Sequence, residues 1–227
     1  MTARVSVIIP AFNAARFLRA AIESVLFQSV AAQEIIVVDD GSSDPTLNVA
    51  KSFGDRLKVF SRPHLGGSQA LNFGIENAAG EAIAFLDADD LWARDKLQLQ
   101  IAALGRDDAL EAVFGHVVQF IGEAPREQGP SNDLESRKQP GAVKSAMLVR
   151  APALRRVGLF DRGFKTADFP EWYARAVSLN LRSLMLSEVV AFRRIHETNT
   201  SRIKRAELYS DYLKLARAAI NRRDKNS

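Results

Sequence analysis

The chain has 227 residues, 47% of them hydrophobic, which is enough for one α/β domain with a complete core and too little for two. It contains no cysteine, so disulfide bonds, thiolate metal sites and cysteine nucleophiles are excluded, and any metal would be bound by oxygen or imidazole. The formal net charge is +4, and residues 201–227 carry eight Lys or Arg against three Asp or Glu, so the basic character is concentrated at the C-terminal end.

The apolar segment near the N-terminus is too short and too rich in β-branched residues for a signal peptide, and Pro10 interrupts it. No other apolar stretch is longer than the core of a strand or a helix, so the sequence predicts no transmembrane span. We therefore expect a soluble, cytoplasmic protein.

Residues 1–104 alternate apolar runs with segments of helical periodicity, the pattern of a parallel sheet wrapped by crossover helices. The expected strands are residues 5–10, 34–39, 57–61 and 82–86. The first helix is expected after Asn13 as its cap, and the second at Pro45, capped by Ser43 or Asp44. Further helices are expected over 67–77 and 92–104.

From residue 105 to residue 201 the alternation loosens, although strands and helices are still expected. The strands are expected over 112–120, 142–150 and 184–192, and the helices over 151–157 and 170–178. Between the first two of these strands, residues 122–141 are polar and rich in Gly and Pro, and this stretch is too long for an ordinary connection. It is therefore interpreted as a mobile loop or lid.

Residues 202–227 are expected to form a basic amphipathic helix and tail. One stripe of this helix carries Ala206, Tyr209, Leu213, Ala216 and Ile220, and the next carries Leu208, Tyr212, Leu215 and Ala219. A helix with so broad an apolar face has to dock on something. Its own domain is the default partner, and the alternatives are a peripheral contact with a membrane surface or a homodimer.

Two groups of carboxylates follow predicted strands. Asp39 and Asp40 close the second strand, while Asp87, Asp89 and Asp90 follow the fourth. Ligands of open α/β sheets bind beyond the carboxyl ends of the strands, so both groups are expected to face one crevice. Carboxylates this close repel one another, and a hard divalent cation would neutralise them. An Asp-x-Asp turn by itself is weak evidence for such a metal.

Three segments, VSVIIPAFNAARFLRAAIESVLFQS, EIIVVDDGSSDPT and ALNFGIENAAGEAIAFLDADDLW, occur in the order and spacing of family 2 glycosyltransferases. The similarity resumes in AMLVRAPALRRVGLFDRGF and FRRIHETNTS, so the chain resembles this family over roughly residues 4–201. The resemblance implies a single-domain glycosyltransferase A fold with a Rossmann-like, mostly parallel central sheet. In that fold residues 1–104 would bind the nucleotide sugar and residues 105–201 would shape the acceptor side.

The resemblance also implies roles for residues in the first half. Pro10, Ala11 and Phe12 would line the nucleobase pocket, where Asp40 would hydrogen-bond the base and Asp39 would lie just behind it. Asp87 would lie near the ribose and the metal, and Asp89 would be the main metal ligand. Asp90 would be a supporting group or the cap of the following helix, and the capping role is at least as plausible as direct ligation.

In the second half, the resemblance implies that Asp168 is the general base, with Glu171 as its rival. His196 matches a histidine that lies near the diphosphate and the metal in this family. Arg193 and Arg194 are candidate diphosphate partners because guanidinium groups suit phosphate oxygens.

Together these features predict an inverting glycosyltransferase that uses Mn²⁺ or Mg²⁺. The donor would be a nucleoside diphosphate sugar, with a UDP-sugar as the first expectation, and the acceptor a glycan, a lipid-linked glycan or a peptide, without nucleic acid. The alternative is a catalytically degenerate module that binds nucleotide sugar or a partner protein, because Leu71 replaces a frequent Arg and Ala167 a usual Glu. A haloacid dehalogenase phosphatase would need Thr or Ser in place of Leu91, and cytidylyltransferases need a glycine-rich basic loop that is missing here.

Overall fold

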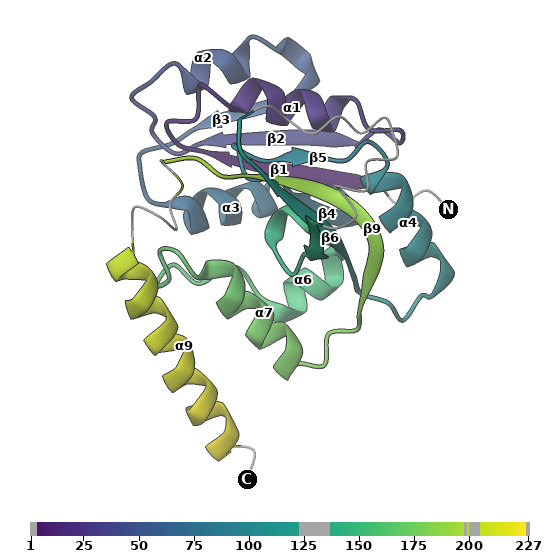
Figure 1. Ribbon diagram of the computed structural model, residues 1–227, viewed down its shortest axis with the longest axis vertical. Helices are drawn as coiled ribbons and strands as arrows, with labels where there is room; N and C mark the ends of the chain where they lie inside the picture. The colour runs from purple at the N-terminus through teal and green to yellow at the C-terminus, as the bar shows by residue number, and fades with distance from the viewer. Residues whose placement is uncertain (1–3, 123–136, 198, 200–204, 226–227) are drawn as a thin grey trace.

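The computed structural model describes residues 4–122, 137–197, 199 and 205–225. In the last of these ranges the side chains are described only for residues 206–217. Its centre is a sheet of nine strands in the order β3-β2-β1-β4-β8-β6-β9-β5, with β7 paired to β6 (Figure 1). Residues 123–136, where most of the lid is expected, lie outside the described residues.

The first part of the sheet is entirely parallel. Its strands are β1 (Val5–Ala11), β2 (Glu34–Asp39), β3 (Lys58–Ser61) and β4 (Ala82–Phe85). Strand β1 lies between β2 and β4, with Ala11 opposite Asp39 and Ile8 opposite Phe85. Parallel pairing places the carboxyl ends of β1, β2 and β4 at the same edge of the sheet.

The second part of the sheet is mixed. It contains β5 (Leu91–Trp92), β6 (Ala112–Phe120), β7 (Lys138–Pro140), β8 (Leu148–Arg150) and β9 (Ser183–Arg194). Strand β8 runs antiparallel to both β4 and β6, whereas β9 runs parallel to β6. Strand β9 therefore ends near the edge where β4 ends, and it brings residues after 190 to that edge.

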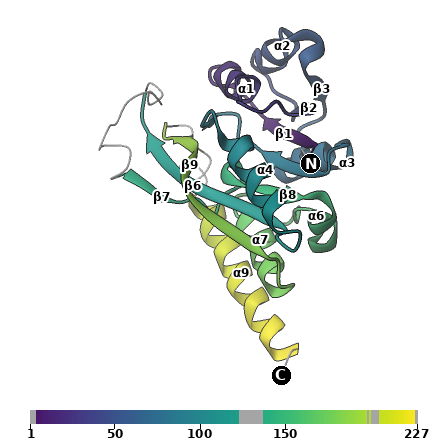
Figure 2. The same cartoon turned by 90° about the vertical axis from the view of Figure 1, so that its right-hand side faces the viewer.

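Helices cover both faces of the sheet (Figures 1 and 2). One face packs against α1 (Leu18–Leu26), α2 (Thr46–Lys51) and α4 (Lys96–Arg106). The other face packs against α3 (Gly67–Glu76), α6 (Ala151–Val157) and α7 (Asp168–Ser178). Strand β1 shows the alternation that this requires, because Val7 and Ile9 belong to the first core and Ile8 to the second.

Several expected elements differ in detail. The helix expected from residue 92 begins at Lys96, because Leu91 and Trp92 pair with β9 as a short strand. The strand expected over 142–150 is divided into a 3-10 turn, η2 (Lys144–Ala146), and β8. Another short 3-10 turn, η1, spans Gly54–Arg56. At Leu91 and Trp92 the pairing with β9 outweighs local helix propensity.

Two expected helix caps also differ. Asn13 does not cap α1, since its φ is 49° and its side-chain oxygen accepts a hydrogen bond from the backbone N–H of Ser43. The helix α1 starts at Leu18, five residues later, with Phe17 at the N-cap position. The helix α2 starts at Thr46 with Pro45 at the N-cap position, so neither Ser43 nor Asp44 holds that position, although the carboxylate of Asp44 accepts a hydrogen bond from the N–H of Thr46.

The last helix, α9 (Arg205–Lys225), projects away from the rest of the chain (Figures 1 and 2). Tyr209, Tyr212 and Leu213 are exposed, and the buried residue among its described side chains is Asp211. Among the described side chains of α9, those of Asp211 and Lys214 make polar contacts with the domain, whereas the default expectation was docking through the apolar face. A contact with a membrane surface or a second copy stays a prediction. No helix among the described residues combines the length and the apolar character needed to cross a bilayer.

Candidate active site

The acidic residues after β2 and β4 meet at one edge of the sheet. The N–H of Asp40 donates to the carbonyl of Ala11, and the N–H of Leu86 donates to the carbonyl of Ile8, so both chains continue beside β1 as they leave the sheet. This arrangement follows from the parallel pairing of three neighbouring strands. It brings Asp40 and the Asp87–Asp89 turn to the same side of the molecule.

At one end of this edge, Asp40 is held tightly by the segment after β3. Its carboxylate accepts hydrogen bonds from the N–H groups of Leu65 and Gly66, each at 2.9 Å, and one oxygen lies 2.8 Å from the ring of His64. The ring of His64 stacks on Phe12 with centroids 4.0 Å apart. Phe12 is 45% exposed, so a flat aromatic surface is presented beside a buried carboxylate.

The neighbouring Asp39 is buried, and one of its carboxylate oxygens, Oδ1, has no hydrogen-bond partner among the described residues. Its other oxygen accepts a hydrogen bond from Ser61 at 3.3 Å. A buried acceptor without a donor costs about 1–3 kcal/mol, so a donor N–H from a bound ligand would be favoured here.

The Asp-x-Asp turn lies next to residues that are more than a hundred positions away in the sequence. Nε2 of His196 is 2.9 Å from Oδ2 of Asp89, and the side chain of Asn199 donates to the same oxygen at 3.2 Å. Asp87 is partly buried, and its pKa is raised by burial and by the nearby carboxylates of Asp89 and Asp168, although Lys144 acts in the opposite direction.

Asp87, Asp89 and His196 form a donor set that fits a divalent cation. Two carboxylates and one imidazole suit Mn²⁺ or Mg²⁺, which commonly leave further positions for phosphate oxygens and water. Burial and the carboxylates of Asp89 and Asp168 raise the pKa of Asp87, and a bound cation would act in the opposite direction. Among the described residues, no three or more His, Asp or Glu side chains are arranged so that they could hold a metal ion together, so a metal at Asp87, Asp89 and His196 stays a prediction.

Asp90 is buried, and of its two expected roles the structure lacks the helix cap. Its carboxylate accepts a hydrogen bond from the hydroxyl of Ser145 at 2.9 Å and one from the N–H of Arg194 at 3.0 Å. Burial and the charges of Asp87 and Asp89 raise its pKa well above the ordinary value. The expected capping role is wrong because no helix starts there, and Asp90 instead joins η2 and the end of β9 to the acidic turn.

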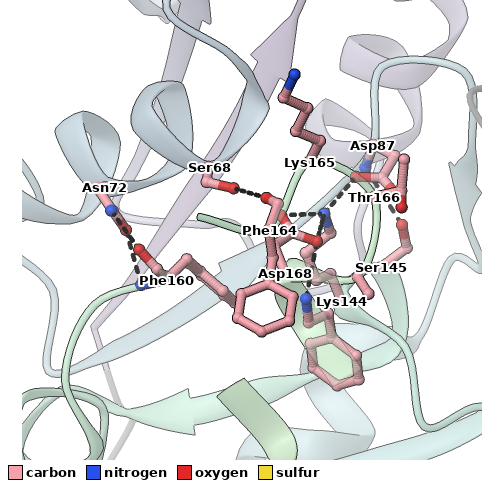
Figure 3. A network of polar contacts seen from close by, with 12 residues as sticks. Ser68, Asn72, Asp87, Lys144, Ser145, Phe160, Phe164, Lys165, Thr166 and Asp168 are labelled. Atoms are coloured by element: carbon pink, nitrogen blue, oxygen red, sulfur yellow. Dashed lines mark hydrogen bonds and ion pairs between the residues drawn. The ribbon is translucent and has the colours of Figure 1, made fainter. Parts of the chain in front are cut away.

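A lysine that the sequence interpretation missed lies opposite the acidic turn (Figure 3). Nζ of Lys144 is 3.2 and 3.1 Å from the two carboxylate oxygens of Asp168, and 3.9 Å from Oδ1 of Asp87. Burial alone would lower the pKa of Lys144, but the charges of Asp168 and Asp87 raise it. Asp168, the first residue of α7, therefore faces the acidic turn across a fixed ammonium group.

Glu171, the rival base, lies one turn further along α7 and is 3% exposed. Both of its carboxylate oxygens accept hydrogen bonds from Nε of Arg175, at 2.9 and 3.0 Å. Arg175 in turn donates to the carbonyls of Val157 and Leu159. Glu171 is thus part of the packing between α6 and α7.

The two arginines expected near a diphosphate differ in their surroundings. The guanidinium of Arg194 donates to the carbonyls of Asp89 and Gly122 and lies 4.5 Å from the centroid of the Phe120 ring. These contacts hold the acidic turn against β6. Arg193 is close enough to Asp87 to lower its pKa, so its charge acts on the acidic turn. Leu71, which replaces a frequent Arg, is buried in the core.

A second buried network lies beneath η2. Lys96 and Gln100 of α4 are fully buried, and Nζ of Lys96 donates to Gln100 and to the carbonyl of Met147, at 3.3 Å for the latter. Burial lowers the pKa of Lys96 well below its usual value. The amide of Gln100 donates to the carbonyl of Ala146 at 2.8 Å. This network supports the segment that presents Lys144 and Ser145, and no local pattern in the sequence indicated it.

The sequence model of glycosyl transferase family 2 matches residues 6–164, more than half of the chain. An uncharacterised glycosyltransferase of Rickettsia typhi is 32% identical over 211 residues, which are 87% of this chain and 65% of that protein. WfgD of Escherichia coli, a UDP-Glc:alpha-D-GlcNAc-diphosphoundecaprenol beta-1,3-glucosyltransferase, is 41% identical over 102 residues, covering 44% of this chain and 40% of WfgD.

Among solved structures, the mannosyltransferase PcManGT from Pyrobaculum calidifontis in complex with GDP-Man and Mn²⁺ is similar with a TM-score of 0.71 and 24% sequence identity. The similarity covers 96% of this chain and 65% of PcManGT, and it confirms the expected glycosyltransferase A fold. This chain therefore spans less than two thirds of the length of each of these three proteins.

Proposed function

The chain belongs to glycosyl transferase family 2, and we propose that it transfers a sugar from a nucleoside diphosphate sugar to an acceptor hydroxyl with inversion at the anomeric carbon. One observation carries this proposal: the carboxylate of Asp168, fixed by Lys144, faces the acidic turn at Asp87. That turn lies at the same edge of the sheet as Asp40.

The donor would lie along this edge. The base would stack near Phe12, with Asp39 and Asp40 as its hydrogen-bond acceptors, and the unpartnered oxygen of Asp39 supports this placement. The diphosphate would lie near the acidic turn, with Arg193 as the arginine partner. Mn²⁺ or Mg²⁺ held by Asp87, Asp89 and His196 would neutralise charge on the departing diphosphate.

Asp168 would act on the acceptor. The acceptor oxygen forms a bond to the anomeric carbon while the bond from that carbon to the diphosphate breaks, and the acceptor proton passes to a carboxylate oxygen of Asp168. A single displacement inverts the anomeric centre. Lys144 keeps both oxygens of Asp168 directed toward the acidic turn. The pairing of Glu171 with Arg175 favours Asp168 as the base.

A lipid-linked acceptor is the proposed acceptor class, because the name of WfgD includes a sugar linked to diphosphoundecaprenol. The exposed side chains of Tyr209, Tyr212 and Leu213 on α9, together with the basic C-terminal segment, suit a peripheral contact with anionic lipid. The protein should co-sediment at low salt with vesicles that contain anionic phospholipid. Equal sedimentation with neutral vesicles, or none with either, would contradict this contact.

The alternative is a module that binds nucleotide sugar without turnover. This alternative rests on two positions of the sequence, because Leu71 replaces a frequent Arg and Ala167 replaces a usual Glu. Both side chains are buried. Release of nucleoside diphosphate distinguishes the two functions. Turnover that depends on Mn²⁺ supports the enzyme, whereas binding of nucleotide without any release supports the module.

The decisive experiment combines a panel of nucleotide sugars with Mn²⁺ and compares wild type with Asp168→Asn. We expect this substitution to lower turnover by about 10²- to 10⁴-fold, the usual contribution of a general base, and to leave nucleotide affinity nearly unchanged. Asp108→Asn is the matched control because the side chain of Asp108 is fully exposed and its nearest cation, on Arg150, is 3.9 Å away. Undiminished turnover in Asp168→Asn would remove this residue from the mechanism.

A further inference from the structure

Residues 163–167, which precede Asp168, are hydrogen-bonded to two helices that are distant in sequence, α3 and α9. On one side the hydroxyl of Ser68, in α3, donates to the carbonyl of Phe164 at 3.2 Å (Figure 3). On the other side Nζ of Lys214, in α9, donates to the carbonyl of Gly163 at 2.9 Å and lies 5.6 Å from the ring centroid of Phe164. The position of this segment therefore depends on α9.

Asp211, which is 1% exposed, makes the largest number of these contacts. Its Oδ2 accepts hydrogen bonds from three consecutive backbone N–H groups, those of Lys165 and Thr166 at 2.9 Å and that of Ala167 at 3.3 Å. The hydroxyl of Thr166 donates to the same oxygen at 3.0 Å. Its Oδ1 accepts a hydrogen bond from Lys214 at 3.1 Å.

This geometry is that of an anion bound by consecutive peptide N–H groups just before a helix. The three groups belong to the residues that lead into α7, and the last of them is Ala167 at the N-cap position, where no side chain forms a cap. Burial by itself would raise the pKa of Asp211, but the hydrogen bonds from Thr166, Lys214 and Ala167 lower it. The charge at the start of α7 is thus provided by a residue 43 positions after Asp168 on a separate helix.

We propose that α9 is a positioning element of the active site and that Asp211 is the residue through which it acts. The three peptides bound by Asp211 end directly at Asp168, whose carboxylate is otherwise held by Lys144. Fixing these peptides fixes the point from which the Asp168 side chain projects toward the acidic turn. Because a displacement of about 1 Å at a reacting group lowers rates by up to about 10²-fold, this restraint matters for turnover. The inference rests on the proposed role of Asp168 as the base.

The position of α9 makes this restraint adjustable. Among the described side chains of α9, Asp211 is the buried one, and the contacts of Asp211 and Lys214 join this part of the helix to the domain. A rearrangement of α9 would release the three peptide N–H groups that lie just before α7. The catalytic carboxylate is therefore tied to the orientation of the C-terminal helix.

The test uses the full chain, with UDP-glucose and GDP-mannose as donors, Mn²⁺ present, and release of nucleoside diphosphate as the readout. Asp211→Asn keeps the side-chain shape and removes the charge, so we expect kcat to fall by about 10- to 100-fold while the KM for the donor changes by less than about twofold. Glu207→Gln is the matched control, because it removes one negative charge from the same helix and Glu207 is only half-buried. This control should behave as wild type.

A double variant separates positioning from a merely structural role. If Asp211 acts through Asp168, adding Asp211→Asn to Asp168→Asn should not lower the residual turnover further, whereas independent structural damage would add to it. An unchanged kcat in Asp211→Asn, or a fully additive loss in the double variant, overturns the inference. No release of nucleoside diphosphate by wild type overturns the proposed function itself, and with it the role of Asp168 on which this inference depends.

Discussion

Replacing Lys144 by Met should destabilise the protein, because the buried carboxylate of Asp168 would lose its positively charged partner. The Lys144 and Asp168 side chains keep 17% and 11% of their exposure, and Lys144 also lies 3.9 Å from Asp87. Breaking such a buried pair by removing one partner costs about 3–5 kcal/mol. We expect about 3 kcal/mol, the lower limit, because Asp168 retains a hydrogen bond from the N–H of Phe169 at 2.8 Å.

The matched control is Arg4→Met. Nε of Arg4 lies 3.2 Å from Glu81, about as close as Lys144 lies to Asp168, but the two side chains are 62% and 56% exposed. An exposed pair contributes little to the free energy of unfolding regardless of its short distance. The two variants therefore test whether burial, and not distance, sets the free energy of an ion pair in this chain.

Urea denaturation of both variants measures these differences if the slope m is unchanged. Combining Lys144→Met with Asp168→Asn should restore most of the lost stability, because the double variant leaves neither charge of this pair buried alone. If Lys144→Met costs no more than Arg4→Met, the argument that Lys144 is the required counter-charge of Asp168 is refuted.

Two further predictions concern other parts of the site. Lys96 has a lowered pKa in the folded state, so the unfolded chain binds this proton more tightly. The free energy of unfolding of wild type, measured relative to that of Lys96→Met, should therefore rise with pH up to the unfolded-state pKa of about 10.4. A difference that does not change with pH, measured by urea denaturation at several pH values, would mean that folded Lys96 keeps its charge. Gly41→Ala should lower the free energy of unfolding and weaken nucleotide binding, because Gly41 has φ of +73° and an added Cβ would lie 2.7 Å from the backbone N of His64. Gly54 is the control, because its φ is +62° and the space around it is open, so Gly54→Ala should lower the free energy of unfolding only by the dihedral cost of about 1 kcal/mol. Equal losses of stability in the two variants, measured by calorimetry, would contradict the steric part of this prediction.

Local patterns were sufficient for most of the secondary structure. The bounds of β2, β6 and α6 agree with the predicted ranges, because uninterrupted apolar runs and helical periodicity reflect burial of one element against its neighbours. The same patterns failed at Leu91 and Trp92, which form a strand only because β9 lies beside them. They also failed at residues 142–150, where η2 interrupts the expected strand.

The candidate site divides in the same way. Asp40, Asp87 and Asp89 could be predicted from the sequence because each follows an apolar strand, and parallel strands end at one edge. The side chains that compensate these charges could not be predicted. Lys144 reaches Asp168 across 24 positions of the sequence, and Asp211 reaches Thr166 across 45.

The sequence by itself therefore determined which residues carry charge at the ends of the strands and to which family the motifs belong. The tertiary structure decided which partner each charge has: Lys144 for Asp168, His196 for Asp89, and three peptide N–H groups for Asp211. The physical reason is that periodicity records only whether a side chain faces a core. The partner of a buried charge depends on the packing of separate helices and strands, which no local stretch of the chain contains.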